Sequence, residues 1–233
     1  MRAARSLALP LAVLLGLALP AAAAHALSPV PRGDLAKLEA RHAQLLARFR
    51  PDLAANWSVE TPPGEPFVGL NESNVESHLR MLRAMLEQAK ALPAEARKES
   101  LVVRLERQIE ETAPGGVLRR DHLLWLDIVS AAARAPLASG PASGCARTTR
   151  IARQLRAVPE ALRGAAVLLR SAPPPNDRAF ETQVSRVEWL FRQDLPSRTE
   201  VCREPRRLVE FARADTLAAR ALAVFRRRVT TPL

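Results

Sequence analysis

The chain has 233 residues, and its 35 lysine and arginine residues against 24 aspartate and glutamate residues give a formal net charge of +11. Almost all of the basic residues are arginines, and acidic residues are interspersed among them, as is typical of solvated helix faces. Tyrosine is absent, so the arginines are not interleaved with aromatic residues as they are in nucleic-acid-binding surfaces. The composition therefore disfavours nucleic acid as a partner and leaves anionic polymers and lipid headgroups open.

Residues 1–26 have the layout of a secretory signal peptide. Two arginines precede an apolar run over 7–24, and small residues then form a cleavage site before Leu27. An uncleaved membrane anchor is the alternative, because the apolar run approaches the length of a spanning helix. Two prolines and an alanine-rich end favour cleavage. We therefore expect an exported bacterial protein, periplasmic or secreted, whose part 27–233 is a single helical domain with no transmembrane segment.

Apolar residues recur with helical spacing along most of this part. The predicted helices cover about 34–50, 73–92, 94–112, 121–135, 147–170, 176–196 and 205–229. Loops rich in proline or glycine separate them, and no run of alternating β-branched residues indicates a strand. We therefore predict an all-α fold, an irregular array of about six to seven antiparallel helices with no sheet.

Local signals predict how the first two helices begin and end. Asp34 is expected to cap the first helix, and Pro51 is expected to end it. Several prolines favour a loop from there to Leu70. Ser73 and Glu76 have the spacing of a capping box, which predicts the start of the second helix.

The stretch over 147–170 is predicted to be the central helix of the array. Its apolar stripe is flanked by arginines on both sides. Pro159 lies inside the stretch, where its ring and its missing N–H are expected to kink the helix or to divide it in two.

Charged residues of the last two helices also carry predictions. Glu188 and Arg192 have the spacing of an outward ion pair on a helix that is expected to end by Pro196. Asp215 falls on the apolar stripe of the last helix. A buried carboxylate needs a partner, so we expect an arginine of the same or a neighbouring helix beside it.

The chain has two cysteines, Cys145 and Cys202. In an oxidising compartment they are expected to form a disulfide, because two isolated thiols make a poor zinc site. Closing so long a loop contributes on the order of 4 kcal/mol to stability.

The sequence contains no complete catalytic or metal-binding motif. No histidine is followed by a glutamate, as zincins require, and no serine lies in a nucleophile elbow. His42 is interpreted as a buried, hydrogen-bonded residue. Asp121 and His122, with Asp127, could act as an acid and a base, but an acidic helix cap is the simpler interpretation of Asp121. We therefore assign no catalytic, cofactor-binding or metal-binding residue and expect no cofactor.

Four arginines recur every seven residues along the last helix and are expected to share one face. We call them the arginine ridge: Arg206, Arg213, Arg220 and Arg227. The ridge is a candidate anion-binding site. In an exported protein its partner would be an anionic envelope polymer.

Four blocks of the sequence resemble a known family. They cover 47–59, 119–132, 147–175 and 191–196, and the most specific are RTTRIARQLRAVPEALRGAAVLLRSAPPP and FRQDLP. They are similar to the N-terminal helical half of the bacterial family called domain of unknown function 885. Full-length members look like zinc metallopeptidases with a zincin-like fold and a His-Glu helix in their C-terminal half. No position of this chain matches that motif, so the resemblance implies the helical fold and no catalytic residue.

Three functional hypotheses follow. The first is an exported, non-catalytic helical domain that acts as a binding or scaffold module. The second is the helical subunit of a split metallopeptidase, whose protein partner would carry the zinc-binding half. The third is a basic protein that binds an anionic envelope polymer through the arginine ridge.

Overall fold

The computed structural model describes residues 35–62, 64–138, 144–175 and 177–231. Within these ranges the chain forms helices and loops without a strand, as predicted. The predicted leader, its cleavage site and the cap at Asp34 lie outside the described residues. No helix of the described part is both long enough and apolar enough to cross a membrane.

Each predicted helix is present, and its ends lie within a few residues of the expected ones. In chain order the elements are α1 (Leu35–Phe49), α2 (Pro51–Asn56), α3 (Val75–Lys90), α4 (Ala96–Thr112), the 3₁₀ turn η1 (Val117–Arg119), α5 (His122–Ala138), α6 (Gly144–Leu168), α7 (Asp177–Trp189), the π-helix η2 (Leu190–Asp194), α8 (Leu195–Thr199) and α9 (Pro205–Thr230). The short helices α2 and α8 were not predicted.

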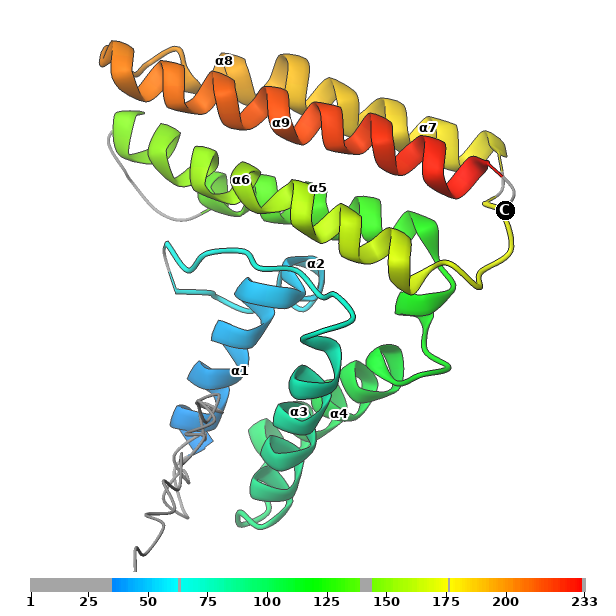
Figure 1. Ribbon diagram of the computed structural model, residues 1–233. Coiled ribbons are helices and arrows are strands. Elements are labelled where there is room, and N and C mark those ends of the chain that lie inside the picture. The colour runs from blue at the N-terminus through cyan, green and yellow to red at the C-terminus, as the bar shows by residue number, and fades with distance from the viewer. Residues whose placement is uncertain (1–34, 63, 139–143, 176, 232–233) are drawn as a thin grey trace, which may run out of the picture.

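Four helices pack into a bundle that forms the upper part of Figure 1. In this bundle α6 contacts α5 and α9, and α7 contacts the same two helices. The hairpin of α3 and α4 lies below the bundle together with α1, and α2 packs on α5. The successive long helices of the bundle, α5, α6, α7 and α9, alternate in direction, so α6 and α9 run parallel along their length.

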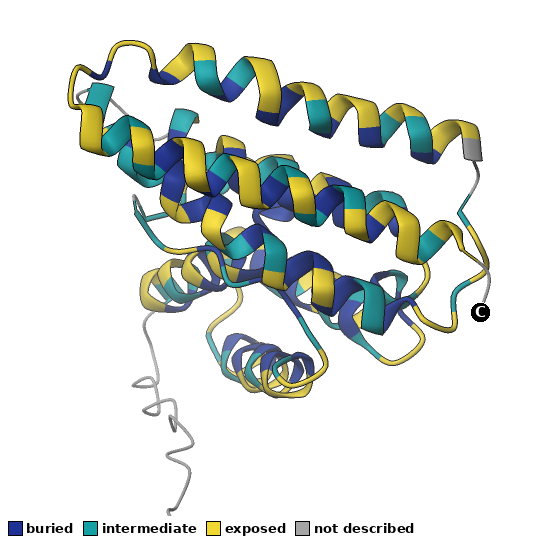
Figure 2. Ribbon diagram, turned by 45° about the horizontal axis from the view of Figure 1, so that its top comes forward, coloured by how far each residue is buried: buried dark blue, intermediate teal, exposed yellow. Residues whose placement is uncertain are grey.

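The predicted central helix, α6, lies in the core. Its apolar stripe is buried, and Figure 2 shows buried residues on the inner faces of the surrounding helices. At Gly164 the helix meets the segment that precedes α3: a Cβ there would lie 2.6 Å from the Cβ of Asn71. α6 continues through Pro159, so the proline does not divide it.

Two prolines that were predicted to end helices lie in the first turns of short helices, although α1 does end just before Pro51, at Phe49. Pro51 begins α2, so the predicted loop from 51 to 70 is wrong over its first six residues. Pro196 lies in the first turn of α8, so the predicted end there is also wrong. The first turn of a helix tolerates proline because its backbone N–H groups have no intrahelical acceptor.

The predicted capping box at Ser73 is wrong as well. The Oδ1 atom of Asn71 accepts hydrogen bonds from the backbone N–H groups of Ser73 and Asn74, at 3.0 Å each. This turn delays the start of α3 to Val75. The side chain of Asn71 therefore occupies the backbone N–H of Ser73, which Glu76 would bond in a capping box.

Candidate functional site

A cleft of about 1560 Å³ opens beside the central helix. One wall is formed by α2 and residues 58–62, 64 and 65 after it, and the other by α5, α6 and α7. On α5 the cleft is lined by small residues, which include Ser130 and Ala131. This volume exceeds the 300–1,000 Å³ that is typical of small-molecule pockets.

The rim of the cleft is held by hydrogen bonds from α6. The Oε1 atom of the buried Gln154 accepts from the backbone N–H of Phe67 at 2.6 Å, and its Nε2 donates to the carbonyl of Glu65 at 2.9 Å. The preceding residue, Arg153, donates to the carbonyl of Gly64 at 3.1 Å. Gly64 has a φ of +87°, a conformation that glycine adopts most easily. α6 thus fixes the segment that closes one side of the cleft.

Arginines from three helices line the cleft. Arg153 and Arg186 donate hydrogen bonds to neighbouring groups, Arg186 to Gln183 at 3.4 Å. Arg134 on α5 and Arg150 on α6 have no hydrogen-bond or ion-pair partner among the described residues. Their guanidinium groups are therefore available to a ligand that offers carboxylate or carbonyl oxygens.

Trp189 supplies an aromatic surface at the same place. It lies on the cleft wall at the end of α7, and 56 % of its surface is exposed. The π-helix η2 begins at the next residue. π-helical turns shift the direction of side chains relative to an α-helix and are frequent at functional sites. The sequence pattern of α7 identified its buried stripe and gave no sign that Trp189 would face a cleft.

No side-chain hydrogen bond joins the predicted acid and base, Asp121, Asp127 and His122, which all lie in the described part of the chain. Asp121 caps α5, with its Oδ1 accepting from the backbone N–H groups of Leu123 at 2.8 Å and Leu124 at 3.2 Å, so the simpler interpretation is confirmed. His122 is buried with its ring edge towards Phe180. Asp127 lies in the cleft, where burial and two nearby carboxylates raise its pKa.

A cluster of buried ion pairs lies next to the cleft and shares Asp52 with it. The guanidinium of Arg50 forms a bidentate ion pair with Asp52, in which Nε donates to Oδ1 at 3.0 Å and Nη2 donates to Oδ2 at 2.8 Å. The same Nη2 donates to Glu111 of α4 at 2.8 Å. Arg107, one turn earlier on α4, also donates to Glu111 at 3.0 Å. Because Asp52 lines the cleft while Arg50 is buried, the cluster joins the cleft to the α3–α4 hairpin.

Two of the histidines share one glutamine behind this cluster. The Nε2 atom of His42 lies 3.0 Å from the Oε1 of Gln108, and the Nε2 of Gln108 lies 3.3 Å from the Nε2 of His78. The prediction that His42 is buried and hydrogen-bonded is confirmed. In the described residues no group of three histidine, cysteine or acidic side chains could hold a metal ion.

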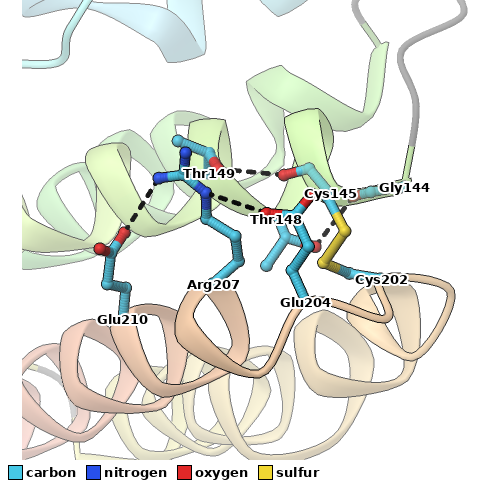
Figure 3. The surroundings of a disulfide bond; sticks show 8 residues. All are labelled: Gly144, Cys145, Thr148, Thr149, Cys202, Glu204, Arg207 and Glu210. Atoms are coloured by element: carbon cyan, nitrogen blue, oxygen red, sulfur yellow. Dashed lines mark hydrogen bonds and ion pairs between the residues drawn. A yellow bond between two sulfur atoms is a disulfide. The ribbon is translucent and has the colours of Figure 1, made fainter.

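A disulfide joins Cys145 and Cys202, as predicted (Figure 3). Their Cα atoms are 4.5 Å apart. The bond ties the first turn of α6 to the loop that precedes α9. Gly144 allows the close approach, because a Cβ there would lie 2.6 Å from a methyl group of Val201.

The arginine ridge lies on the outside of α9, where Arg206, Arg213, Arg220 and Arg227 are all exposed. Arg206 forms an ion pair with Glu210 at 3.5 Å. The buried residues of α9, such as Phe211 and Leu222, lie on the opposite side of the helix. None of the ridge arginines lines the cleft, so the two are separate candidate sites.

The arginine that was expected beside Asp215 is Arg192, whose charge acts on the carboxyl without a hydrogen bond to it. Burial raises the pKa of its carboxyl to about 6, and the charge of Arg192 opposes that rise. No hydrogen-bond donor reaches its buried Oδ1 in the described part of the chain. Arg192 does not pair with Glu188 as predicted, because both flank the start of η2, whose wider turn changes the spacing.

Comparison with known proteins finds no matching family model, no matching curated protein and no matching solved structure.

Proposed function

We propose that the protein is an exported, non-catalytic binding module that holds a segment of a partner polypeptide in the cleft beside α6. The observation that carries this proposal is the size and lining of the cleft. Its volume of about 1560 Å³ suits an extended chain better than a single small molecule. Arg134 and Arg150 can receive the carbonyl or carboxylate oxygens of that chain, and Trp189 can pack against its apolar side chains.

A peptide library displayed on phage and selected on the disulfide-bonded protein tests this function. Replacing Ala131 by Trp places a large side chain in the cleft from the wall of α5. We expect Ala131→Trp to weaken the binding of selected peptides at least tenfold, about 1.4 kcal/mol. Ala212→Trp, on an exposed position of α9, is the matched control and should leave binding unchanged. Equal binding to both variants would show that the peptides do not occupy the cleft.

The second candidate, the helical subunit of a split metallopeptidase, draws on the same cleft. The blocks that resemble the helical half of the domain of unknown function 885 family include 47–59, 119–132 and 147–175. Most of the residues on the α2, α5 and α6 sides of the cleft belong to these blocks. This overlap supports a partner chain that carries the zinc-binding half and packs at the cleft.

Co-expression with a chain encoded next to this one that carries a His-Glu zinc motif tests the second candidate. We expect a one-to-one complex that hydrolyses peptides, while neither chain does so alone. Ala131→Trp should prevent the complex and Ala212→Trp should not. A partner that binds Ala131→Trp as well as the parent protein would contradict the use of the cleft.

A further inference from the structure

The outer face of α9 combines positive charge with exposed apolar side chains. We define this face as Val209, Arg213, Leu217, Arg220, Val224 and Arg227. The exposed fractions of Leu217, Val209 and Val224 are 51 %, 50 % and 39 %. The three arginines have no ion-pair partner among the described residues. Exposed apolar residues interleaved with arginines are unusual on a solvated helix, where polar residues normally occupy the outward positions.

Carboxylates are absent from this face. α9 is described along its whole length and has two acidic residues, Glu210 and Asp215. Glu210 pairs with Arg207 at 3.4 Å and lies 3.7 Å from Arg156 of α6. Asp215 is half-buried, with its Oδ1 in the interior. The positive potential of the outer face is therefore not neutralised within its own helix.

A shallow groove of about 240 Å³ between α6 and α9 borders the outer face. Leu162, Leu217, Val224 and Phe225 give it an apolar lining. Three arginines also line it, which are Arg163, Arg220 and Arg228. An apolar groove beside guanidinium groups suits a ligand with an aliphatic part next to an anionic group, as in a phospholipid.

We propose that the protein docks through the outer face of α9 onto an anionic lipid surface. The arginines would contact the lipid phosphates, while Leu217 and Val224 would enter the boundary between headgroups and acyl chains. The outer face runs from Val209 to Arg227 of α9, so it offers about 28 Å of contact at 1.5 Å per residue. An anionic polysaccharide would engage the arginines but would gain nothing from the exposed apolar side chains. The pattern therefore favours lipid over polymer.

Co-sedimentation of the disulfide-bonded protein with lipid vesicles in physiological salt tests the proposal. We expect binding to vesicles that contain phosphatidylglycerol and little binding to vesicles of phosphatidylcholine alone. The triple variant Arg213→Ser, Arg220→Ser, Arg227→Ser should lower the partition coefficient roughly 100-fold, because each arginine contributes about fivefold near an anionic surface. Leu217→Ser with Val224→Ser should lower it roughly tenfold.

The matched control removes the same charge elsewhere. Arg80→Ser, Arg83→Ser and Arg120→Ser replace three arginines that are exposed outside α9. This variant should bind vesicles like the parent protein. All variants change exposed or partly exposed positions, and unchanged circular dichroism would show that each is folded.

Three results would overturn the proposal. One is an equal loss in the control variant, which would reduce the effect to net charge. Another is unchanged binding by the Leu217→Ser, Val224→Ser variant, which would leave only electrostatic attraction. The third is binding to an anionic polysaccharide without binding to vesicles, which would show that the outer face of α9 binds a polymer. Ala131→Trp should bind vesicles normally, so the outcome is independent of the proposed role of the cleft.

Discussion

At the residue scale, His42, Gln108 and His78 form one chain of hydrogen bonds buried between α1, α3 and α4. The amide serves both rings only while His78 is neutral, since its oxygen accepts from the N–H of His42 and its nitrogen donates to the unprotonated Nε2 of His78. A proton on His78 would place two donors opposite each other. Burial lowers the pKa of both histidines, and the charge of Arg50 helps to lower the pKa of His78 to about 3.

The first prediction concerns acid stability. The unfolded chain gains protons on these histidines below about pH 6.5, whereas folded His78 gains one only near pH 3. The free energy of unfolding should therefore fall as the pH falls through this window, by about 1.4 kcal/mol per pH unit for His78. Urea denaturation at several pH values measures the slope. His78→Leu should be less stable at neutral pH but show a shallower slope, and an unchanged slope would contradict the assignment.

The second prediction concerns Asp215, which should lower the free energy of unfolding as the pH rises. The raised pKa of Asp215, about 6, means that the folded state holds a proton that the unfolded state loses near pH 3.8, so ionisation costs stability as the pH rises. Asp215→Asn removes this cost. Because the carboxyl is only half-buried and solvent screens it, we expect a gain of roughly 1 kcal/mol at pH 7.5 and about a third of that at pH 4.5. Urea denaturation at the two pH values checks this, and an equal effect at both would rule out a role for the charge.

At the element scale, two prolines show which helix boundaries the local sequence pattern fails to predict. The spacing of apolar residues located the long helices, including α6 and α9, because burial of one face sets their period. The same local rules treated Pro51 and Pro196 as helix ends. Each lies in the first turn of a new helix, which a chain can form only where neighbouring elements bury its apolar side, as Leu53 and Leu195 are buried.

The third prediction tests the contact between α6 and the segment before α3. Alanine at position 164 would favour the helix by its intrinsic propensity but would place its Cβ 2.6 Å from the Cβ of Asn71 and 2.9 Å from the carbonyl oxygen of Leu70. We expect Gly164→Ala to lower the free energy of unfolding by about 1–3 kcal/mol because this contact overpacks the core. Thermal denaturation provides the measurement.

Gly115 offers the matched control for that substitution. An added Cβ there meets nothing within 4 Å. Gly115→Ala should therefore leave stability unchanged or raise it slightly. Equal stability of the two variants would mean that the segment at Asn71 yields to the new methyl group.

At the scale of the whole molecule, the disulfide and the parallel pairing of α6 and α9 belong together. A bridge near the N-terminal ends of two helices aligns them in the same direction, and Figure 3 shows the chain around it. Beyond the bridge, Arg207 of α9 pairs with Glu204 and Glu210, and Thr149 of α6 bonds the carbonyl of Cys145. The disulfide therefore fixes the end of the bundle from which both long helices begin.

The fourth prediction concerns reduction of this bond. The cysteines are 57 positions apart, and opening a loop of that length should cost about 4 kcal/mol in the chain-entropy model. We expect Cys145→Ser with Cys202→Ser to lower the melting temperature by several degrees or more. Differential scanning calorimetry of the oxidised protein, the reduced protein and the variant makes the comparison. The oxidised and reduced proteins would melt together if the cysteines were not bridged in solution.

The sequence by itself determined the helical class, the helix positions, the cysteine pair and the single-faced arginine ridge, because each depends on spacing along one chain. Only the tertiary structure decided which helices meet. It placed Arg134, Arg150 and Trp189 around one cleft, and it joined His42 to His78 through Gln108. Helical period tells which face of a helix is apolar but not which helix will cover it. A cleft made by several helices therefore leaves no pattern in any one of them.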